Sequence, residues 1–104
     1  MGYIPIRFLF KWCILLQISV NMDINKDLRI HIGKAIAEIR KNNRQTQHDI
    51  SFITGIDSAD VSKYETGKIN FTLRTLLRFA IALQVHPREL FDFEFDITKY
   101  RIEE

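Results

Sequence analysis

Residues 55–68, GIDSADVSKYETGK, decide the fold that we expect of this chain. Gly55 tolerates the left-handed backbone of a tight turn, and Asp57 or Ser58 makes a good N-cap, so the stretch predicts a turn and then a helix to about Thr66. The apolar residues of this helix are mainly Val61 and Tyr64. The other positions carry small or polar side chains that face outward: Ser58, Ala59, Ser62 and Lys63. Such an outer face needs a use other than packing.

Two further helices are expected before this stretch. Apolar residues recur at helical spacing between Leu28 and Ile39, which predicts an amphipathic helix from residue 28 to about 41. Thr46 is a good N-cap with Asp49 three residues later, so a second helix is expected over about 47–54, ending at Gly55. The second and third helices are then joined by about three residues, which is the helix-turn-helix plan.

The helix-turn-helix plan explains the polar outer face of residues 58–63. In this plan the second helix of the pair enters the major groove of DNA. The groove admits a helix, and short polar side chains let that helix come close to the edges of the bases. The sequence therefore predicts a DNA-reading helix over about residues 58–66.

The chain then continues with two helices and a strand in our interpretation. Thr72 caps a fourth helix, whose predicted buried face consists of Leu73, Leu76, Leu77, Ala80 and Leu83. Pro87 fits the first turn of a short fifth helix over residues 87–91. Residues 91–97, FDFEFDI, alternate apolar and acidic residues, which predicts a strand. That strand needs a partner, either the N-terminal apolar segment or the same strand of a second subunit.

The first 27 residues are interpreted as an apolar extension that is expected not to be essential. The segment IPIRFLFKWCILLQISV is interrupted by Arg7 and Lys11, and its longest uninterrupted run is shorter than the roughly 20 residues of a membrane span. Three readings stay open for residues 1–21: a dispensable extension upstream of Met22, a packed structural element, or an export or membrane segment. We expect a helical domain over 28–91 and an acidic tail over 92–104.

Composition favours one globular domain with a mildly basic body. The chain has 104 residues, of which 46% are hydrophobic. Residues 28–91 hold ten Lys and Arg against six Asp and Glu, whereas residues 92–104 hold two against five. The basic body is weak support for a polyanionic partner. Cys13 is the only cysteine and the three histidines lack ligand spacing, so we expect no disulfide within the chain, no metal site and no cofactor.

Most of the chain resembles the helix-turn-helix domain of the phage Cro/repressor (XRE-type) family. The resemblance covers about residues 30–91 and rests on the Thr46–Gln47 start, the Gly55 turn, VSKYETG at 61–67 and the helix around 76–85. It implies an all-α, five-helix, lambda-repressor-like domain that binds specific sequences of double-stranded DNA, usually as a homodimer on a palindromic operator. We therefore expect a cytoplasmic, repressor-like transcriptional regulator that neither spans a membrane nor acts as an enzyme.

The resemblance also implies roles for individual residues. Gln47, beside Thr46 at the start of its helix, corresponds to a glutamine that contacts a phosphate and braces the recognition helix. Arg40 and Glu65 correspond to a pair that bridges the first and third helices. Base reading is implied for Ser58, Ala59, Ser62 and Lys63, and contact with the DNA backbone for Lys68 and Asn70.

Three positions depart from the pattern of this family. Ala59 has no hydrogen-bonding group, so it can only touch a thymine methyl group. Asp60 adds a negative charge beside the expected DNA interface, which costs affinity unless it accepts from a cytosine or lies off the groove. Gln84 replaces the glycine that usually precedes Val85.

An alternative function is an antitoxin-like or other protein-interaction helix-turn-helix module. The acidic, aromatic tail and the apolar residues Phe52, Ile53 and Phe71 favour some contact with another protein. The two functions are compatible with each other. An enzyme is disfavoured because no nucleophile, base and orienting group share a motif, and because the chain has no Gly-rich phosphate loop.

Overall fold

The structure is a computed structural model that describes residues 23–100, so the three readings of residues 1–21 lie outside the described residues. Its elements are α2 (Ile24–Asn42), α3 (Gln47–Thr54), α4 (Ser58–Glu65), α5 (Leu73–Leu83) and two short 3-10 helices, η1 (Pro87–Phe91) and η2 (Ile97–Lys99). Residues 25–94 form one compact unit, and the other described residues belong to a second unit.

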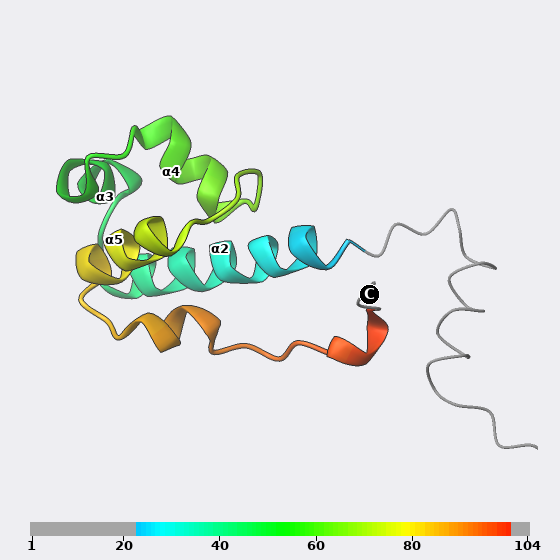
Figure 1. Ribbon diagram of the computed structural model, residues 1–104. Helices are drawn as coiled ribbons and strands as arrows, with labels where there is room; N and C mark the ends of the chain where they lie inside the picture. The colour runs from blue at the N-terminus through cyan, green and yellow to red at the C-terminus, as the bar shows by residue number, and fades with distance from the viewer. Residues whose placement is uncertain (1–22, 101–104) are drawn as a thin grey trace, which may run out of the picture. The chain divides into compact units, whose positions relative to one another are not determined.

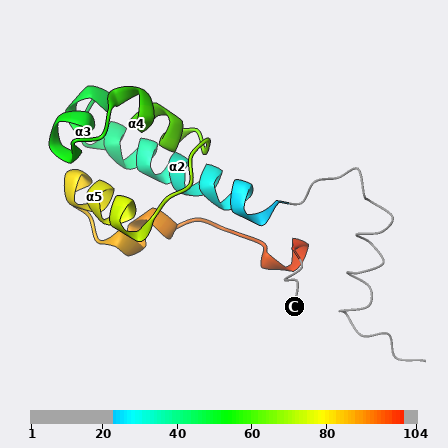
Figure 2. The same cartoon turned by 45° about the horizontal axis from the view of Figure 1, so that its top comes forward.

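Four α-helices build the compact unit. Helix α3 packs against α4 and α5, the end of α4 lies against the long α2, and the chain passes from α3 to α4 through a short turn (Figures 1 and 2). The core is contributed by all of them and by η1. Its buried apolar residues are Ile32, Ile36, Ile50, Val61, Leu76, Phe79, Ala80, Ala82, Leu83 and Leu90. The prediction of a helical fold is thereby confirmed.

The helix ends follow the expected capping chemistry. Thr46 caps α3 in a capping box with Asp49, and Gly55 ends the helix in the left-handed conformation at φ 77°. Asp57 is the N-cap of α4, and Thr72 is the N-cap of α5. The predicted second and third helices therefore lie within a residue of their expected bounds. The first helix begins at Ile24 rather than at residue 28, so residues 24–27 belong to it.

The predicted buried face of α5 is partly wrong. Leu73 and Leu77 are 81% and 50% exposed, whereas Phe79 is fully buried. The rings of Tyr64 and Phe71 lie against Phe79 at centroid distances of 5.4 Å and 6.1 Å, so the large aromatic side chain determines which arc of α5 faces the core. Leu73 and Leu77 are left on a neighbouring arc.

The C-terminal part has a short helix at the expected residues but lacks the expected strand. Residues 87–91 form the helix η1, which is of the 3-10 type, and residues 23–100 contain no strand. A strand forms only where a neighbouring strand accepts and donates its ladder hydrogen bonds. Phe93 instead packs against the core and stacks on His31, with ring centroids 4.9 Å apart.

Candidate nucleic-acid interface

The turn between α3 and α4 is fixed by its own backbone and by two core residues. Gly55 N–H donates to the Ser51 carbonyl at 2.9 Å, and Thr54 Oγ1 accepts from Ile56 N–H at 3.1 Å. Ile50 of α3 and Val61 of α4 are both fully buried. Because each helix anchors one side chain in the same core, α4 is held at a defined position with its other face outward.

The outer face of α4 carries the residues that the sequence predicts to read bases. Ala59 and Lys63 are exposed, and Ser58 and Ser62 are half-buried. Lys63 Nζ lies 3.9 Å from Asp60 Oδ1, and both side chains are about half exposed. Asp60, which departs from the family pattern, thus has a cation beside it. Such an exposed pair is weak, because water and salt screen it, and Lys63 is easily drawn to another anion.

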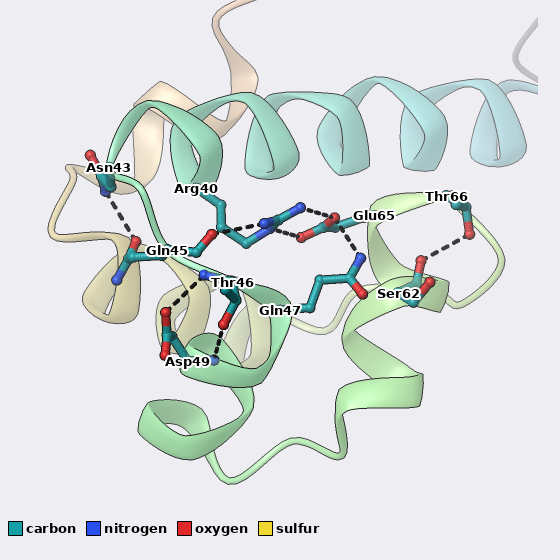
Figure 3. A network of polar contacts seen from close by, with 9 residues as sticks. All are labelled: Arg40, Asn43, Gln45, Thr46, Gln47, Asp49, Ser62, Glu65 and Thr66. Carbon is teal, nitrogen blue, oxygen red and sulfur yellow. Dashed lines mark hydrogen bonds and ion pairs between the residues drawn. The ribbon is translucent and has the colours of Figure 1, made fainter.

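A buried polar network connects α4 to α2 and α3 (Figure 3). The Arg40 guanidinium donates to the Glu65 carboxylate through Nε at 2.7 Å and through Nη2 at 3.1 Å. Nη1 of Arg40 donates to the Gln45 carbonyl at 2.8 Å, and Gln47 Nε2 donates to Glu65 Oε1 at 3.0 Å. The structure therefore brings Arg40, Glu65 and Gln47 together, at the point where three helices meet.

The side chain of Gln47 is less exposed than that of a residue whose only role is to contact a phosphate. Its side chain is half-buried and its amide nitrogen is turned toward Glu65, whereas the neighbouring Thr46 is exposed. Thr46 Oγ1 accepts from Asp49 N–H at 3.0 Å, and Asp49 Oδ2 accepts from Thr46 N–H at 2.8 Å. The backbone hydrogen bond from Thr46, followed by the bond with its side chain, holds the pKa of the Asp49 carboxyl below its ordinary value of 3.8.

The loop after α4 presents the two residues expected to contact the DNA backbone. Lys68 and Asn70 are both exposed. Arg29 of α2 donates through Nε to the Gly67 carbonyl at 3.0 Å and through Nη1 to Asn70 Oδ1 at 2.8 Å. Sequence reasoning missed Arg29, because a contact across 38 residues leaves no trace in local periodicity.

Two more features that the sequence analysis did not predict hold the helices around the site in place. Asn43 Nδ2 donates to the Leu83 carbonyl at 2.9 Å and Gln45 Nε2 to the Ala82 carbonyl at 3.1 Å, so the α2–α3 turn caps the end of α5. A Cβ on Gly33 would lie 2.4 Å from the Glu65 carbonyl oxygen, so α2 and α4 approach through their backbones. A glycine inside a helical pattern was the available signal for this approach.

Other kinds of site find little support in the described part of the chain. Over residues 23–100 no group of three or more His, Cys, Asp and Glu side chains is arranged to hold a metal ion. Within the same range none of the helices combines the length and the apolar character that crossing a membrane requires. Phe71, expected to be available to a partner, is half-buried against Tyr64, whereas Phe52 and Ile53 of α3 are exposed.

Two short helices joined by a tight turn, the second with a polar outer face, define a helix-turn-helix protein of the DNA-binding class. The chain belongs to the Cro/C1-type HTH DNA-binding domain family, whose profile matches residues 35–96.

Solved structures agree with this assignment. The chain is similar to the restriction-modification controller protein C.AhdI from Aeromonas hydrophila, at 34% identity over 62% of this chain and 96% of that one, with a TM-score of 0.59. It is also similar to the hypothetical transcription factor NHTF from Neisseria, at 25% identity over 68% of this chain and 82% of that one, again with a TM-score of 0.59. A comparison with curated proteins gave no match.

Proposed function

We propose that this protein is a sequence-specific, DNA-binding transcriptional regulator that acts as a homodimer, with α4 lying in the major groove. The observation that carries the proposal is the small, polar outer face of α4, held in place by the buried contacts of Arg40, Glu65 and Gln47. A rigid helix with short side chains can approach base edges without losing conformational entropy on binding. The regulatory names of the two similar structures support the same role.

The proposed contacts divide into base reading and backbone binding. Ser58, Ala59, Ser62 and Lys63 face the bases in this proposal, and Thr46, Gln47, Lys68 and Asn70 lie toward the phosphates. Lys63 is the only one of the base-reading residues with a charge, and it is exposed. Lys63 is therefore the residue that we assign to a guanine edge, where a good contact is worth about 1–3 kcal/mol of discrimination.

Selection of bound sequences from a pool of random duplexes tests the proposal. We expect one enriched sequence with two inverted half-sites, whose centres lie about one helical turn apart. Affinity for that sequence should fall steeply with salt, with a log–log slope of about −0.9 for each phosphate contact. No enrichment above the starting pool, or an affinity that does not change with salt, would contradict the proposal.

A substitution in the selected complex separates base reading from backbone binding. Lys63→Ala should reduce the preference for the selected sequence over a scrambled duplex by about 1–3 kcal/mol. Lys68→Ala should weaken binding to both duplexes by a similar factor, because a phosphate contact carries no sequence information. Equal effects of the two substitutions on the preference would contradict the assignment of Lys63.

The homodimer is supported by an apolar stripe on α5. Leu73, Leu77 and Ile81 follow one another at intervals of four residues and are 81%, 50% and 72% exposed. Three large apolar side chains in a line on the surface are typical of an interaction site. Because the described tail contains no strand, we place the subunit contact on this stripe rather than on residues 91–97.

A second candidate function is the binding of another protein to α3. Phe52 is 87% exposed and Ile53 is 52% exposed, beside a surface depression that also includes Gln45, His48 and Asp49. This face does not include the proposed base-reading residues of α4, so a protein partner and DNA are compatible. Loss of a partner with Phe52→Ser, while affinity for DNA stays unchanged, would establish this second role.

A further inference from the structure

We propose that Arg29 and Asn70 together bind one backbone phosphate of the DNA, and that Arg29 positions the loop that carries Asn70 and Lys68. This inference rests on the function proposed above. It adds a residue from α2 to an interface that the helix-turn-helix pattern alone places on α3, α4 and the following loop.

Arg29 joins two different groups of the loop. Its Nε donates to the Gly67 carbonyl at 3.0 Å, and its Nη1 donates to Asn70 Oδ1 at 2.8 Å. The first bond is partly buried and satisfies a carbonyl just beyond the end of α4, where a cation is favourable. The second bond is at the surface. Arg29 thus has one end of its guanidinium anchored and the other near solvent.

The bond with Arg29 also determines which way the side-chain amide of Asn70 is oriented. A guanidinium has only donors, so the atom facing Arg29 must be the oxygen of Asn70. The Nδ2 group of Asn70 is then turned away from Arg29 as a donor. A guanidinium has five N–H groups, of which the two bonds to the loop use two. The pair therefore offers several N–H donors and one positive charge, which is the set that a phosphate binds.

The loop is held against α2 by close backbone contact as well. Gly67 has φ +76°, and a Cβ at this position would lie 2.7 Å from Ile30 Cγ1 and 2.9 Å from Ile30 Cα. The loop backbone consequently rests on the turn of α2 that precedes Gly33. Because α2 is a continuous helix here, it gives the loop a rigid support, and Arg29 determines how residues 67–70 leave α4.

Arg29 lies outside the part of the chain that the family profile matches. The match begins at residue 35, whereas α2 begins at Ile24, so the first turns of α2 precede it. The Arg29 contact is therefore read from the geometry of this chain and not from the family profile.

The test is the salt dependence of duplex binding by full-length Arg29 variants, with the selected sequence and a scrambled duplex measured between about 50 and 300 mM salt. Arg29→Gln should lower affinity for both duplexes by about tenfold and reduce the magnitude of the log–log slope by about 0.9, the value for one phosphate. Arg29→Lys keeps the positive charge but loses the planar guanidinium with its paired N–H donors, so it should lower affinity while it keeps most of the slope. Arg88→Gln, which removes an exposed arginine from η1, is the matched control and should change affinity much less.

A double variant tests whether the two residues act as one site. Asn70→Ala should add little to the effect of Arg29→Gln, because either substitution breaks the same pair. Full additivity of the two effects, wild-type affinity for Arg29→Gln, or an equal loss with Arg88→Gln would overturn the inference. If Arg29→Gln melts well below the wild type, the charge-retaining Arg29→Lys decides the question: affinity equal to that of the wild type would overturn the inference.

The two proposals fail in different ways. A wild-type protein that binds no duplex contradicts the proposed function and the phosphate site with it. A wild-type protein that binds DNA with a steep salt dependence, and that is unaffected by Arg29→Gln, contradicts the phosphate site alone.

Discussion

The backbone of Gly33 in α2 lies directly against the carbonyl of Glu65 at the end of α4, where an added Cβ would stand only 2.4 Å from the oxygen. Alanine normally stabilises a helix by about 1 kcal/mol relative to glycine. Here we expect Gly33→Ala to destabilise the protein by about 1–3 kcal/mol, because neither backbone can yield without moving α4. Urea unfolding measures this, with the exposed Lys34→Ala as the control; a gain in stability would contradict the close approach.

Removal of one partner of the buried Arg40–Glu65 pair should be costly. The two side chains are 11% and 6% exposed, so either charge left alone has little access to water. Arg40→Met is expected to lower the free energy of unfolding by about 3–5 kcal/mol. Lys41→Met, at the exposed neighbouring position, should change it by less than about 0.5 kcal/mol.

The double variant Arg40→Met, Glu65→Leu distinguishes a stranded charge from lost packing. It should be more stable than Arg40→Met alone, because no unpaired charge remains in the core. A double variant that is less stable than either single variant would mean that packing, rather than the stranded charge, dominates.

A substitution of Gln84 is expected to stabilise the protein rather than to destabilise it. It ends α5 in the left-handed conformation, at φ 58° and ψ 44°, where a non-glycine residue is strained by about 1–2 kcal/mol. Glycine removes this strain but gains conformational entropy in the unfolded chain, worth about 0.4–1 kcal/mol. Gln84→Gly should therefore stabilise the protein by roughly 0.5–1 kcal/mol in thermal unfolding. Gln84→Ala keeps its Cβ and should give no such gain.

Local chemistry explains which elements could be predicted from the sequence. The ends of α3 and α4 were predictable because Thr46, Gly55 and Asp57 act on residues within one turn of themselves. The buried arc of α5 was not, because Leu77 and Phe79 are both apolar and only the rings of other elements decide between them. Local pattern fixes where a helix ends, whereas packing fixes which way it faces.

The same division holds for the candidate site. The pairing of Arg40 with Glu65 was expected only through the family resemblance, since the two residues are 25 positions apart. Arg29 had no such guide, and its contacts with Gly67 and Asn70 became visible only when α2 and the loop were placed together. The predicted strand at 91–97 failed because alternation predicts two faces but cannot supply a neighbouring strand.

Asp49 predicts a limited pH dependence of stability. The pKa of its carboxyl is lowered in the folded state by the hydrogen bonds with Thr46, so its contribution is present above the ordinary value of 3.8 and is lost as the pH falls through the folded pKa. Asp49→Asn should therefore be less stable than the wild type at about pH 7, and the difference should shrink toward about pH 3. Urea unfolding at both pH values checks this, with the exposed Glu38→Gln as the control. A difference that grows on acidification would contradict the assigned direction.

The apolar stripe of α5 predicts where two copies of the chain meet. Leu77 is the middle residue of Leu73, Leu77 and Ile81, and a closed dimer about a two-fold axis would bury it against its own copy. Leu77→Glu places two like charges at that contact, so sedimentation at micromolar concentration should change from dimer to monomer. Leu77 is half exposed in a single copy, so Leu77→Glu should lower the melting temperature no more than an ordinary surface substitution does. DNA affinity should fall as well, because two linked recognition helices bind one operator more tightly than one.

A chain that ends at Glu94 keeps Phe93 on the core and removes most of the tail, and it should still form the dimer. Dimerisation that survives Leu77→Glu but is lost on truncation would move the contact from α5 to the tail, and a monomeric wild type would remove it from both.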